Sequence, residues 1–216
     1  MRTWALVQQK GGSGKSTLAT NLAVAGEQAG EIVLIVDLDP QRSAVLWHDV
    51  RGNDQPAVTD TLPQHLGKVL EAADENGATL AIVDTAGELD EATLAALKAA
   101  DVLICPTRPD LFNLASLKET VALLGKAGKL PKAVAVINAV NESGAAATVG
   151  EARAVLKTLK LTDCPVVIYN RPAFAAASNK GRAVIEVQAK GKAADEIREL
   201  YAWLDENTSK RRRKSK

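Results

Sequence analysis

Residues 9–17 read QKGGSGKST, and the fold of the whole chain can be worked out from this stretch. It lies between an apolar run at residues 4–7 and a run with helical periodicity at residues 18–29. A strand, a glycine loop and a helix in this order can cradle phosphate groups, because the loop N–H groups and the helix N-terminus both present positive partial charge to an anion. The stretch therefore predicts a nucleotide-phosphate site.

The glycine loop departs from the common pattern G-x-x-x-x-G-K-[ST]. Gln9 stands at the first glycine position of that pattern, and a second lysine, Lys10, precedes the glycines. In such loops a lysine at the position of Lys15 reaches the β- and γ-phosphates, and a hydroxyl at Ser16 holds Mg²⁺. A glycine turn with incidental lysines is the alternative, which the flanking strand and helix disfavour. We expect nucleotide contacts from Lys10, Gly11, Gly12, Ser13, Gly14, Lys15, Ser16 and Thr17.

Length and composition favour a single α/β domain. The chain has 216 residues, of which 46% are hydrophobic, enough for a core of its own. No apolar run approaches the length of a membrane span, and no secretory signal precedes the first expected strand. Cys105 and Cys164 stand alone in apolar surroundings, which favours buried thiols over a disulfide or a metal site. We expect a cytoplasmic protein.

Six strand-like runs alternate with helical segments, which predicts a doubly wound, mostly parallel sheet with helices on both faces. The runs are almost continuously apolar, as expected of strands buried on both faces. Ligands of such sheets bind beyond the carboxyl ends of the strands, so Asp37, Asp84 and Asn138 are candidates by position. The runs are residues 4–8, 32–37, 80–84, 102–106, 133–138 and 166–169.

Three motifs, in this order, resemble those of the ParA/MinD family of ATPases with a deviant P-loop. They are the form KGGxGK[ST] in residues 10–16, DLDPQ in residues 37–41, which resembles the family's switch I, and LAIVDTAG in residues 80–87, which resembles its Walker B-like and switch II segment. The resemblance implies the P-loop NTPase fold, with ATP and Mg²⁺ as cofactors. A P-loop that begins at Gln9 leaves no room for an N-terminal helix-turn-helix domain, so the chain looks like a short, ParF-like ParA protein.

The resemblance also implies roles for single residues. Asp39 would position the hydrolytic water and, with Ser16 and Asp84, lie near Mg²⁺. Lys10 would reach the ATP of a partner subunit much as an arginine finger does, and Asn138 matches a position at which relatives touch the adenine ring. Without the resemblance, Asp39 and Asp84 would suit a purely structural role, as a helix cap or a strand end, as well as a role at a nucleotide site. The implied catalytic residues are Lys10, Lys15 and Asp39, and the implied switch residues are Asp37, Pro40, Gln41 and Gly87.

By this resemblance the protein would dimerise around two ATP·Mg²⁺ and bind nucleoid DNA without sequence preference. A ParB-like adaptor would stimulate hydrolysis and release the DNA, and the cargo would be a plasmid or a chromosome. The alternatives are a positioning ATPase for a protein cargo, a MinD-like membrane-associated regulator, and a nucleotide-dependent module that barely hydrolyses ATP. Membrane binding is disfavoured because acidic residues, which anionic lipids would repel, lie opposite the apolar stripe of the last expected helix, residues 193–206.

Basic residues near the C-terminus are the candidates for DNA contact. Arg171, Lys180 and Arg182 gather in a stretch with few acids, where DNA binding and an ordinary solvated loop are equal alternatives. Aromatic residues make up 3%, too few to stack single-stranded nucleic acid, so double-stranded DNA is the expected partner. Residues 1–207 would form the ATPase domain and residues 208–216 a disordered basic tail. The tail candidates are Lys210, Arg211, Arg212, Arg213 and Lys214.

Overall fold

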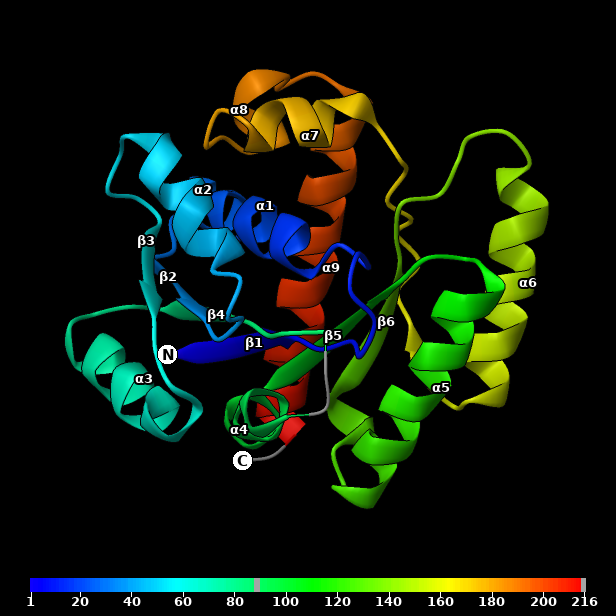
Figure 1. The fold of residues 1–216 in the computed structure, drawn as a ribbon, viewed down its shortest axis with the longest axis horizontal. Coiled ribbons are helices and arrows are strands. Elements are labelled where there is room, and N and C mark those ends of the chain that lie inside the picture. The colour runs from blue at the N-terminus through cyan, green and yellow to red at the C-terminus, as the bar shows by residue number, and fades with distance from the viewer. Residues whose placement is uncertain (88–89, 215–216) are drawn as a thin grey trace.

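Within residues 1–87 and 90–214, which this computed structural model describes, seven strands form one parallel sheet. Their spatial order is β3-β2-β4-β1-β5-β6-β7, with β1 in the middle (Figure 1). The sheet confirms the predicted doubly wound α/β class. The strands are β1 (Arg2–Leu6), β2 (Val33–Asp37), β3 (Ala57–Asp60), β4 (Leu80–Asp84), β5 (Val102–Thr107), β6 (Ala133–Ile137) and β7 (Thr162–Asp163).

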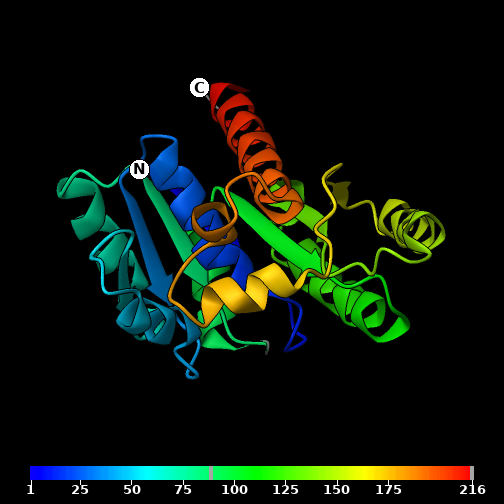
Figure 2. The same cartoon turned by 90° about the horizontal axis from the view of Figure 1, so that it is seen from above.

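Helices cover both faces of the sheet (Figure 2). One face carries α1 (Lys15–Gln28), α2 (Ser43–Arg51), α7 (Pro172–Ser178), α8 (Val184–Val187) and α9 (Lys192–Lys214). The other carries α3 (Leu66–Glu75), α4 (Glu91–Ala99), α5 (Leu111–Lys126) and α6 (Ala145–Thr158). Two short 3₁₀ turns, η1 (Pro63–His65) and η2 (Leu130–Lys132), precede α3 and β6.

The central strand shows why the strand runs are apolar throughout. Trp4 and Leu6 of β1 pack on the face that holds α1 and α9. Ala5 and Val7 pack on the opposite face, and all four side chains are at most 1% exposed. Because successive side chains of a strand point to opposite faces, only a continuous apolar run can bury both.

The register of the strands brings the polar strand ends together. Asp37 at the end of β2 pairs with Asp84 at the end of β4, and Asp84 pairs in turn with Leu6 of β1. The glycine loop leaves β1 directly after this point. The two acids and the loop therefore lie at one carboxyl edge of the sheet, where ligands of such sheets bind.

The prediction of a sixth strand at residues 166–169 was wrong. The strand beside β6 is instead β7, which ends before Cys164, and Pro165 has no N–H group with which to continue the ladder. The chain returns to the sheet through an isolated bridge between Val140 and Tyr169. Strand β3, a short edge strand, was also not among the six predicted runs.

The last helix is longer than predicted. Ile197, Leu200, Tyr201 and Leu204 of its apolar stripe are buried in the core, as expected. However, α9 continues to Lys214, so disorder from residue 208 onward was the wrong expectation. Lys and Arg are good helix formers, and cations near a helix C-terminus interact favourably with its dipole. Residues 215 and 216, and the side chains of residues 209–214, lie outside the described part of the structure.

No helix among the described residues combines the length and the apolar character that crossing a membrane requires.

The hydroxyl of Thr208 ties α9 to the central strand. It accepts a hydrogen bond from Trp4 Nε1 at 3.0 Å and donates one to the Leu204 carbonyl at 2.7 Å. Thr208→Val would leave the buried indole N–H without an acceptor, so we predict a loss of about 1–3 kcal/mol in the free energy of unfolding. Thr158→Val is the matched control, because Thr158 makes the same bond to a carbonyl four residues earlier but is exposed. Urea unfolding measures both, and equal effects would contradict the anchoring role.

Candidate nucleotide site

The glycine loop between β1 and α1 has the backbone of an anion cradle. Gly12 and Gly14 have φ angles of 76° and 96°, in the left-handed region that glycine adopts without strain. Helix α1 begins at Lys15, and no side chain caps its N-terminus. The first amide groups of α1 can therefore bind phosphate oxygens, and the helix dipole adds positive potential at the same point.

Two neighbours approach the loop so closely that neither Gly14 of the loop nor Gly87 beside it has room for a side chain. A Cβ at Gly14 would lie 2.2 Å from Nδ2 of Asn138, and this nitrogen donates to the Ser13 carbonyl at 2.7 Å. A Cβ at Gly87 would lie 2.8 Å from the backbone nitrogen of Gly11. The end of β6 and the loop after β4 thus both touch the cradle, and Gly87 meets it through backbone alone.

Lys15 is almost buried and has one acceptor. Its Nζ donates to the Gln8 carbonyl at 3.2 Å, and the side chain is 6% exposed. Burial lowers the pKa of Lys15, which the negative charges of Asp84 and Asp39 partly oppose. Gln8 is itself fixed, since its Oε1 accepts from Thr120 Oγ1 at 2.8 Å. A phosphate would be a stronger acceptor for this ammonium than a carbonyl group.

Asp37 holds the turn that follows β2. Its carboxylate accepts from the backbone nitrogens of Asp39, Ala44 and Val45 at 3.0, 2.9 and 3.3 Å. Burial raises the pKa of Asp37, and these three hydrogen bonds oppose the rise. The side chain thereby supplies the cap of α2 that Arg42, at the N-cap position, does not. The three backbone N–H groups of this turn occupy the carboxylate of Asp37. The turn that Asp37 holds places Asp39 at the pocket.

Asp84 is fully buried, and neither carboxylate oxygen has a hydrogen-bond partner among the described residues. Burial raises the pKa of Asp84 to about 7, which the nearby Ser16 hydroxyl partly opposes. Buried carboxylates without partners are costly and are normally paired, hydrogen-bonded or bound to a metal. The oxygens of Asp84, Ser16 and Asp39 form a donor set of the kind that Mg²⁺ prefers, so these residues fit the predicted ion.

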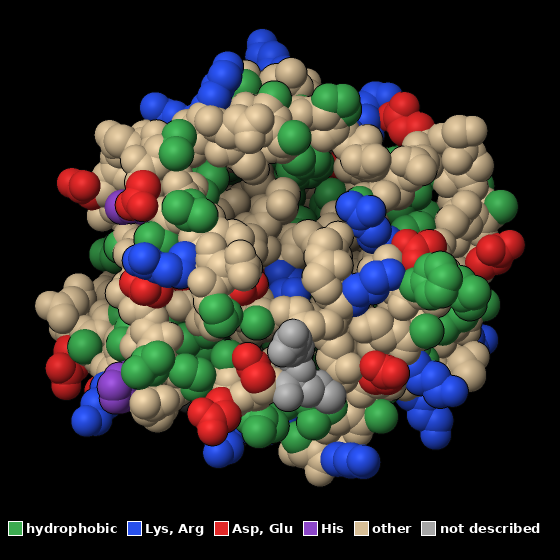
Figure 3. All heavy atoms as spheres, in the orientation of Figure 1, with side chains coloured by type: hydrophobic (Ala, Val, Ile, Leu, Met, Phe, Trp, Pro, Cys, Tyr) green, Lys and Arg blue, Asp and Glu red, His purple; other side chains and the backbone are tan. Residues whose placement is uncertain are grey.

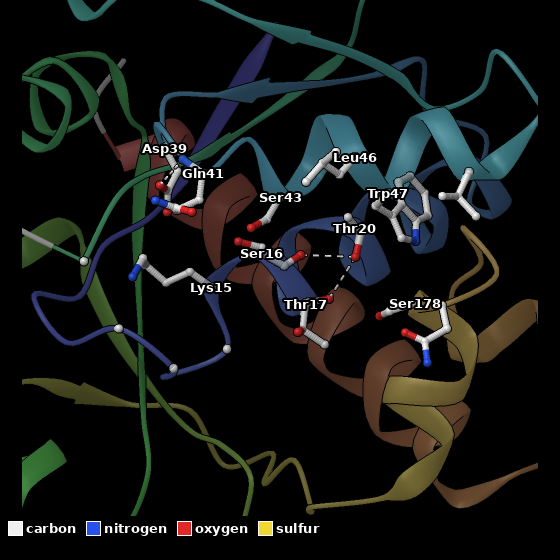
Figure 4. A pocket seen from close by; sticks show the side chains of 16 residues that line it. Lys15, Ser16, Thr17, Thr20, Asp39, Gln41, Ser43, Leu46, Trp47 and Ser178 are labelled. Carbon is white, nitrogen blue, oxygen red and sulfur yellow. Dashed lines mark hydrogen bonds between the residues drawn. The ribbon is translucent and has the colours of Figure 1, made fainter.

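A pocket of about 720 Å³ opens in front of the loop (Figure 4). Lys15, Ser16 and Asp39 lie at one end of it, and Leu46 and Trp47 line the other. Asp39 Oδ1 accepts from the Gln41 backbone nitrogen at 2.9 Å, which fixes the acid at the rim. The pocket thus brings together Lys15, Ser16 and Asp39, whereas the buried Asp84 is not among the residues that line it.

A second hollow, of about 320 Å³, adjoins the first and shares Gly14 and Thr17 with it. Asn138, Tyr169 and Phe174 line it, and an aromatic and amide lining suits a nucleobase. Because the Asn138 amide donates to the loop, the residue supports the cradle as well as lining this hollow. Contact with adenine remains a prediction.

Lys10 does not line the phosphate pocket. Its Nζ lies 5.3 Å from the centre of the Phe112 ring, at the start of α5. The ammonium therefore has an aromatic ring of α5 as its neighbour, outside the set of residues that line the pocket.

The stretch expected to have few acids is rich in acidic partners. Arg171 bonds to Glu196 at 2.6 Å and to Glu142 at 2.8 Å, which raises the pKa of Arg171. Arg182 pairs with Glu186 at 3.3 Å. Glu142 and Glu196 come from distant parts of the chain, so a count along the sequence missed them, whereas Glu186 lies only four residues after Arg182. Lys180 is exposed on the described surface and stays a candidate for DNA contact.

The sequence reading missed the α2 side of the pocket. Leu46, Trp47 and Val50 line it, and Trp47 Nε1 donates to the Arg182 carbonyl at 3.2 Å. The sequence did hold a signal for this side of the pocket. Leu46 and Val50 are apolar and stand four residues apart in the helix that follows the DLDPQ motif. Ser178 of α7 closes the pocket from a segment far along the chain, for which the sequence holds no comparable signal.

Known proteins share both sequence and fold with this chain. The Maintenance of carboxysome distribution protein A of Gloeobacter kilaueensis is 46% identical over 123 residues, which are 56% of this chain and 55% of that protein. A protein of the same name from Halothiobacillus neapolitanus is 29% identical over 209 residues, 92% of this chain and 94% of that one. The chain thus spans about half the length of the first relative and nearly all of the second.

The structure of the septum site-determining protein MinD of Pyrococcus horikoshii, complexed with Mg-ADP, superposes with a TM-score of 0.76. It is 19% identical and covers 97% of this chain and 98% of its own. The sequence profile described as "CobQ/CobB/MinD/ParA nucleotide binding domain" matches residues 4–184. The chain therefore belongs to the CobQ/CobB/MinD/ParA nucleotide-binding family.

Proposed function

We propose that this protein is a ParA-type positioning ATPase that dimerises on ATP, binds double-stranded DNA without sequence preference and distributes a protein assembly as its cargo. The observation that carries the ATP-dependent part is the buried Asp84 without a partner beside the glycine loop. The protein cargo is favoured by the printed names of both relatives, which refer to carboxysome distribution.

Different residues of the chain would bind the phosphates of ATP, hold Mg²⁺ and orient the attacking water. The loop amides and Lys15 would bind the phosphates, with Lys15 leaving the Gln8 carbonyl for a phosphate oxygen. Ser16, Asp84 and Asp39 would hold Mg²⁺, which when bound neutralises charge on the phosphates. Asp39, fixed at the rim by Gln41, would orient the attacking water.

Lys10 would act on the partner's nucleotide. Its ammonium lies over the Phe112 ring, and Lys10 is not among the residues that line its own pocket, which favours action across a dimer over action within one subunit. A cation brought to a phosphate from a second subunit stabilises charge in the transition state, as arginine fingers do.

A partition ATPase for a plasmid or a chromosome, with a ParB-like adaptor, is the second candidate. The presence of ParA in the description of the matching family favours it. Loss of the gene would then raise the rate of plasmid or chromosome loss. Under the first candidate the same loss would leave DNA inheritance intact and distribute a protein assembly unevenly. Either cargo needs an adaptor that stimulates hydrolysis, and association with the nucleoid would supply the surface for movement.

The C-terminal end of α9 is the proposed DNA contact. Residues 210–216 hold six basic residues and no acidic one. Lys180 would add to the surface from the segment between α7 and α8.

We predict that Asp39→Ala binds ATP and forms a lasting ATP dimer but releases phosphate about a hundredfold more slowly, because the group that orients water is lost while Lys15, Ser16 and Asp84 still hold ATP and Mg²⁺. Light scattering with ATP and a phosphate-release assay measure the two properties. Asp54→Ala is the control, an exposed acid in the loop after α2. A monomeric Asp39→Ala protein with normal turnover would contradict the assignment.

We predict that a chain ending at Ser209 binds duplex DNA more weakly in the presence of ATP and shows a shallower salt dependence. The slope of log affinity against log salt should change by up to about five, at about 0.9 for each phosphate that the six removed basic residues no longer neutralise. Fluorescence anisotropy across a salt series measures both quantities.

Two further variants complete the DNA experiment. A chain ending at Lys214 should bind as the full chain does, because it keeps the helical basic residues. Lys180→Gln tests the surface between α7 and α8. If truncation at Ser209 leaves affinity and slope unchanged while Lys180→Gln lowers both, the contact lies at Lys180 and the proposed role of α9 is wrong.

A further inference from the structure

The side chain of Gln8, at the entry to the glycine loop, is buried and tied to two other elements. Gln8 lies between β1 and the loop and is 1% exposed. Its Oε1 accepts hydrogen bonds from Thr120 Oγ1 at 2.8 Å and from the Gln9 backbone nitrogen at 2.9 Å. Its Nε2 donates to the Pro106 carbonyl of β5 at 3.4 Å. Both polar atoms of the side chain thus have partners within the protein, and such a buried network leaves it little freedom to move.

Thr120 supplies the shortest of these bonds. It lies within α5 and is fully buried. A threonine hydroxyl in a helix often donates to the carbonyl four residues earlier, which here is that of Ser116 at 3.2 Å. The hydroxyl has one proton, and the Gln8 oxygen is the closer acceptor. A valine has nearly the same shape as threonine, so filling this position in α5 does not by itself require a hydroxyl.

The same helix also contacts the loop entry from outside. Lys10 Nζ lies over the Phe112 ring in the first turn of α5, a turn that the Asp110 carboxylate caps. Figure 3 shows basic side chains beside an apolar patch over the start of α5. Phe112 and Thr120 are eight residues apart, which is about 12 Å along a helix axis. Helix α5 therefore holds residues 8–10 at two separate points.

Beyond Lys10 the chain has few contacts that could fix its direction. Gly11 and Gly12 have no side chains, and a Cβ built at either would meet no atom within 4 Å. The next buried side chain is that of Ser13. The position of Lys10 thus depends on the residues that precede it, of which Gln8 is the buried one.

We propose that Thr120, through the Gln8 side chain, is a positioning residue that aligns Lys10 for its action on ATP. The inference rests on the proposed role of Lys10 at the partner's nucleotide and adds the buried contact that sets the direction of this lysine. A shift of about 1 Å in a reacting group can cost about a hundredfold in rate. The loop amides at the start of α1 lie at the other end of the loop, so losing the Thr120 hydroxyl should slow turnover and leave ATP affinity unchanged.

A double-variant cycle of Thr120→Val with Lys10→Ala tests the assignment. Phosphate release at saturating MgATP should fall about tenfold in Thr120→Val and about a hundredfold in Lys10→Ala. Adding Thr120→Val to Lys10→Ala should cause no further loss, because Thr120 acts through Lys10. The ATP affinity of Thr120→Val, measured by calorimetry, should stay within about twofold of that of the unmodified protein. Thr120→Ser keeps the hydroxyl and should turn over as the unmodified protein does.

Thr208→Val is the matched control for a loss of stability. Thr208 is also a buried helical threonine whose hydroxyl bonds to a side chain, but that side chain, Trp4, belongs to the core between β1 and α9. Both variants should be less stable in urea, and only Thr120→Val should turn over more slowly at a temperature at which both are folded. Equal losses of turnover in the two variants would mark a general effect of stability and overturn the inference.

Gln8→Met gives a second readout if Thr120→Val does not fold. Methionine is about as long as glutamine and its sulfur is only a weak acceptor. Gln8→Met should therefore show the same fall in turnover and likewise add nothing to Lys10→Ala.

The outcomes separate this inference from the proposed function. Normal turnover in Lys10→Ala would contradict the proposed role of Lys10 itself. A slow Lys10→Ala beside a Thr120→Val protein with normal turnover would overturn the inference alone. Losses that add in the cycle with Lys10→Ala would also overturn it, because Thr120 would then act independently of this lysine.

Discussion

Asp37 and Asp84 are paired across β2 and β4, and the difference between their surroundings organises the site. Asp37 accepts three backbone N–H groups and fixes the turn into α2. Asp84 is equally buried, accepts none, and has its pKa raised to about 7 by burial. One acid therefore stabilises the fold, while the other keeps its oxygens available for a ligand at a cost to stability.

The glycine loop is held by contacts that allow little change in shape. Asn138 at the end of β6 leaves no room for a larger residue at position 14, and the loop backbone at Gly11 leaves no room for a side chain at position 87. A phosphate that shifts the loop would therefore press on the loop after β4, which leads into α4. On the opposite side, α2 connects the pocket to the segment before α8 through Trp47 and the Arg182 carbonyl.

Much of this could be predicted from local patterns. Buried parallel strands, the loop between β1 and α1 and the acids at strand ends all follow from runs of adjacent residues. The structure brings Lys15, Ser16 and Asp39 together around one pocket. The errors concern contacts between distant segments. Thr208 anchors α9 through Trp4, and Glu142 and Glu196 neutralise Arg171, although no local pattern joins these residues. The edge strands β3 and β7 are short, with few apolar residues to mark them.

The central claim is that Asp84 is kept unpaired, at a cost to stability, in order to bind ATP·Mg²⁺. The folded-state pKa of about 7 lies above the ordinary value of 3.8, so the free energy of unfolding falls as pH rises between these values. Urea unfolding at pH 8, with and without MgATP, tests this directly. Asp84→Asn should be more stable than the unmodified protein without ligand and gain less from MgATP. An Asp84→Asn protein that is less stable without ligand, and is stabilised as much by MgATP, would contradict the account.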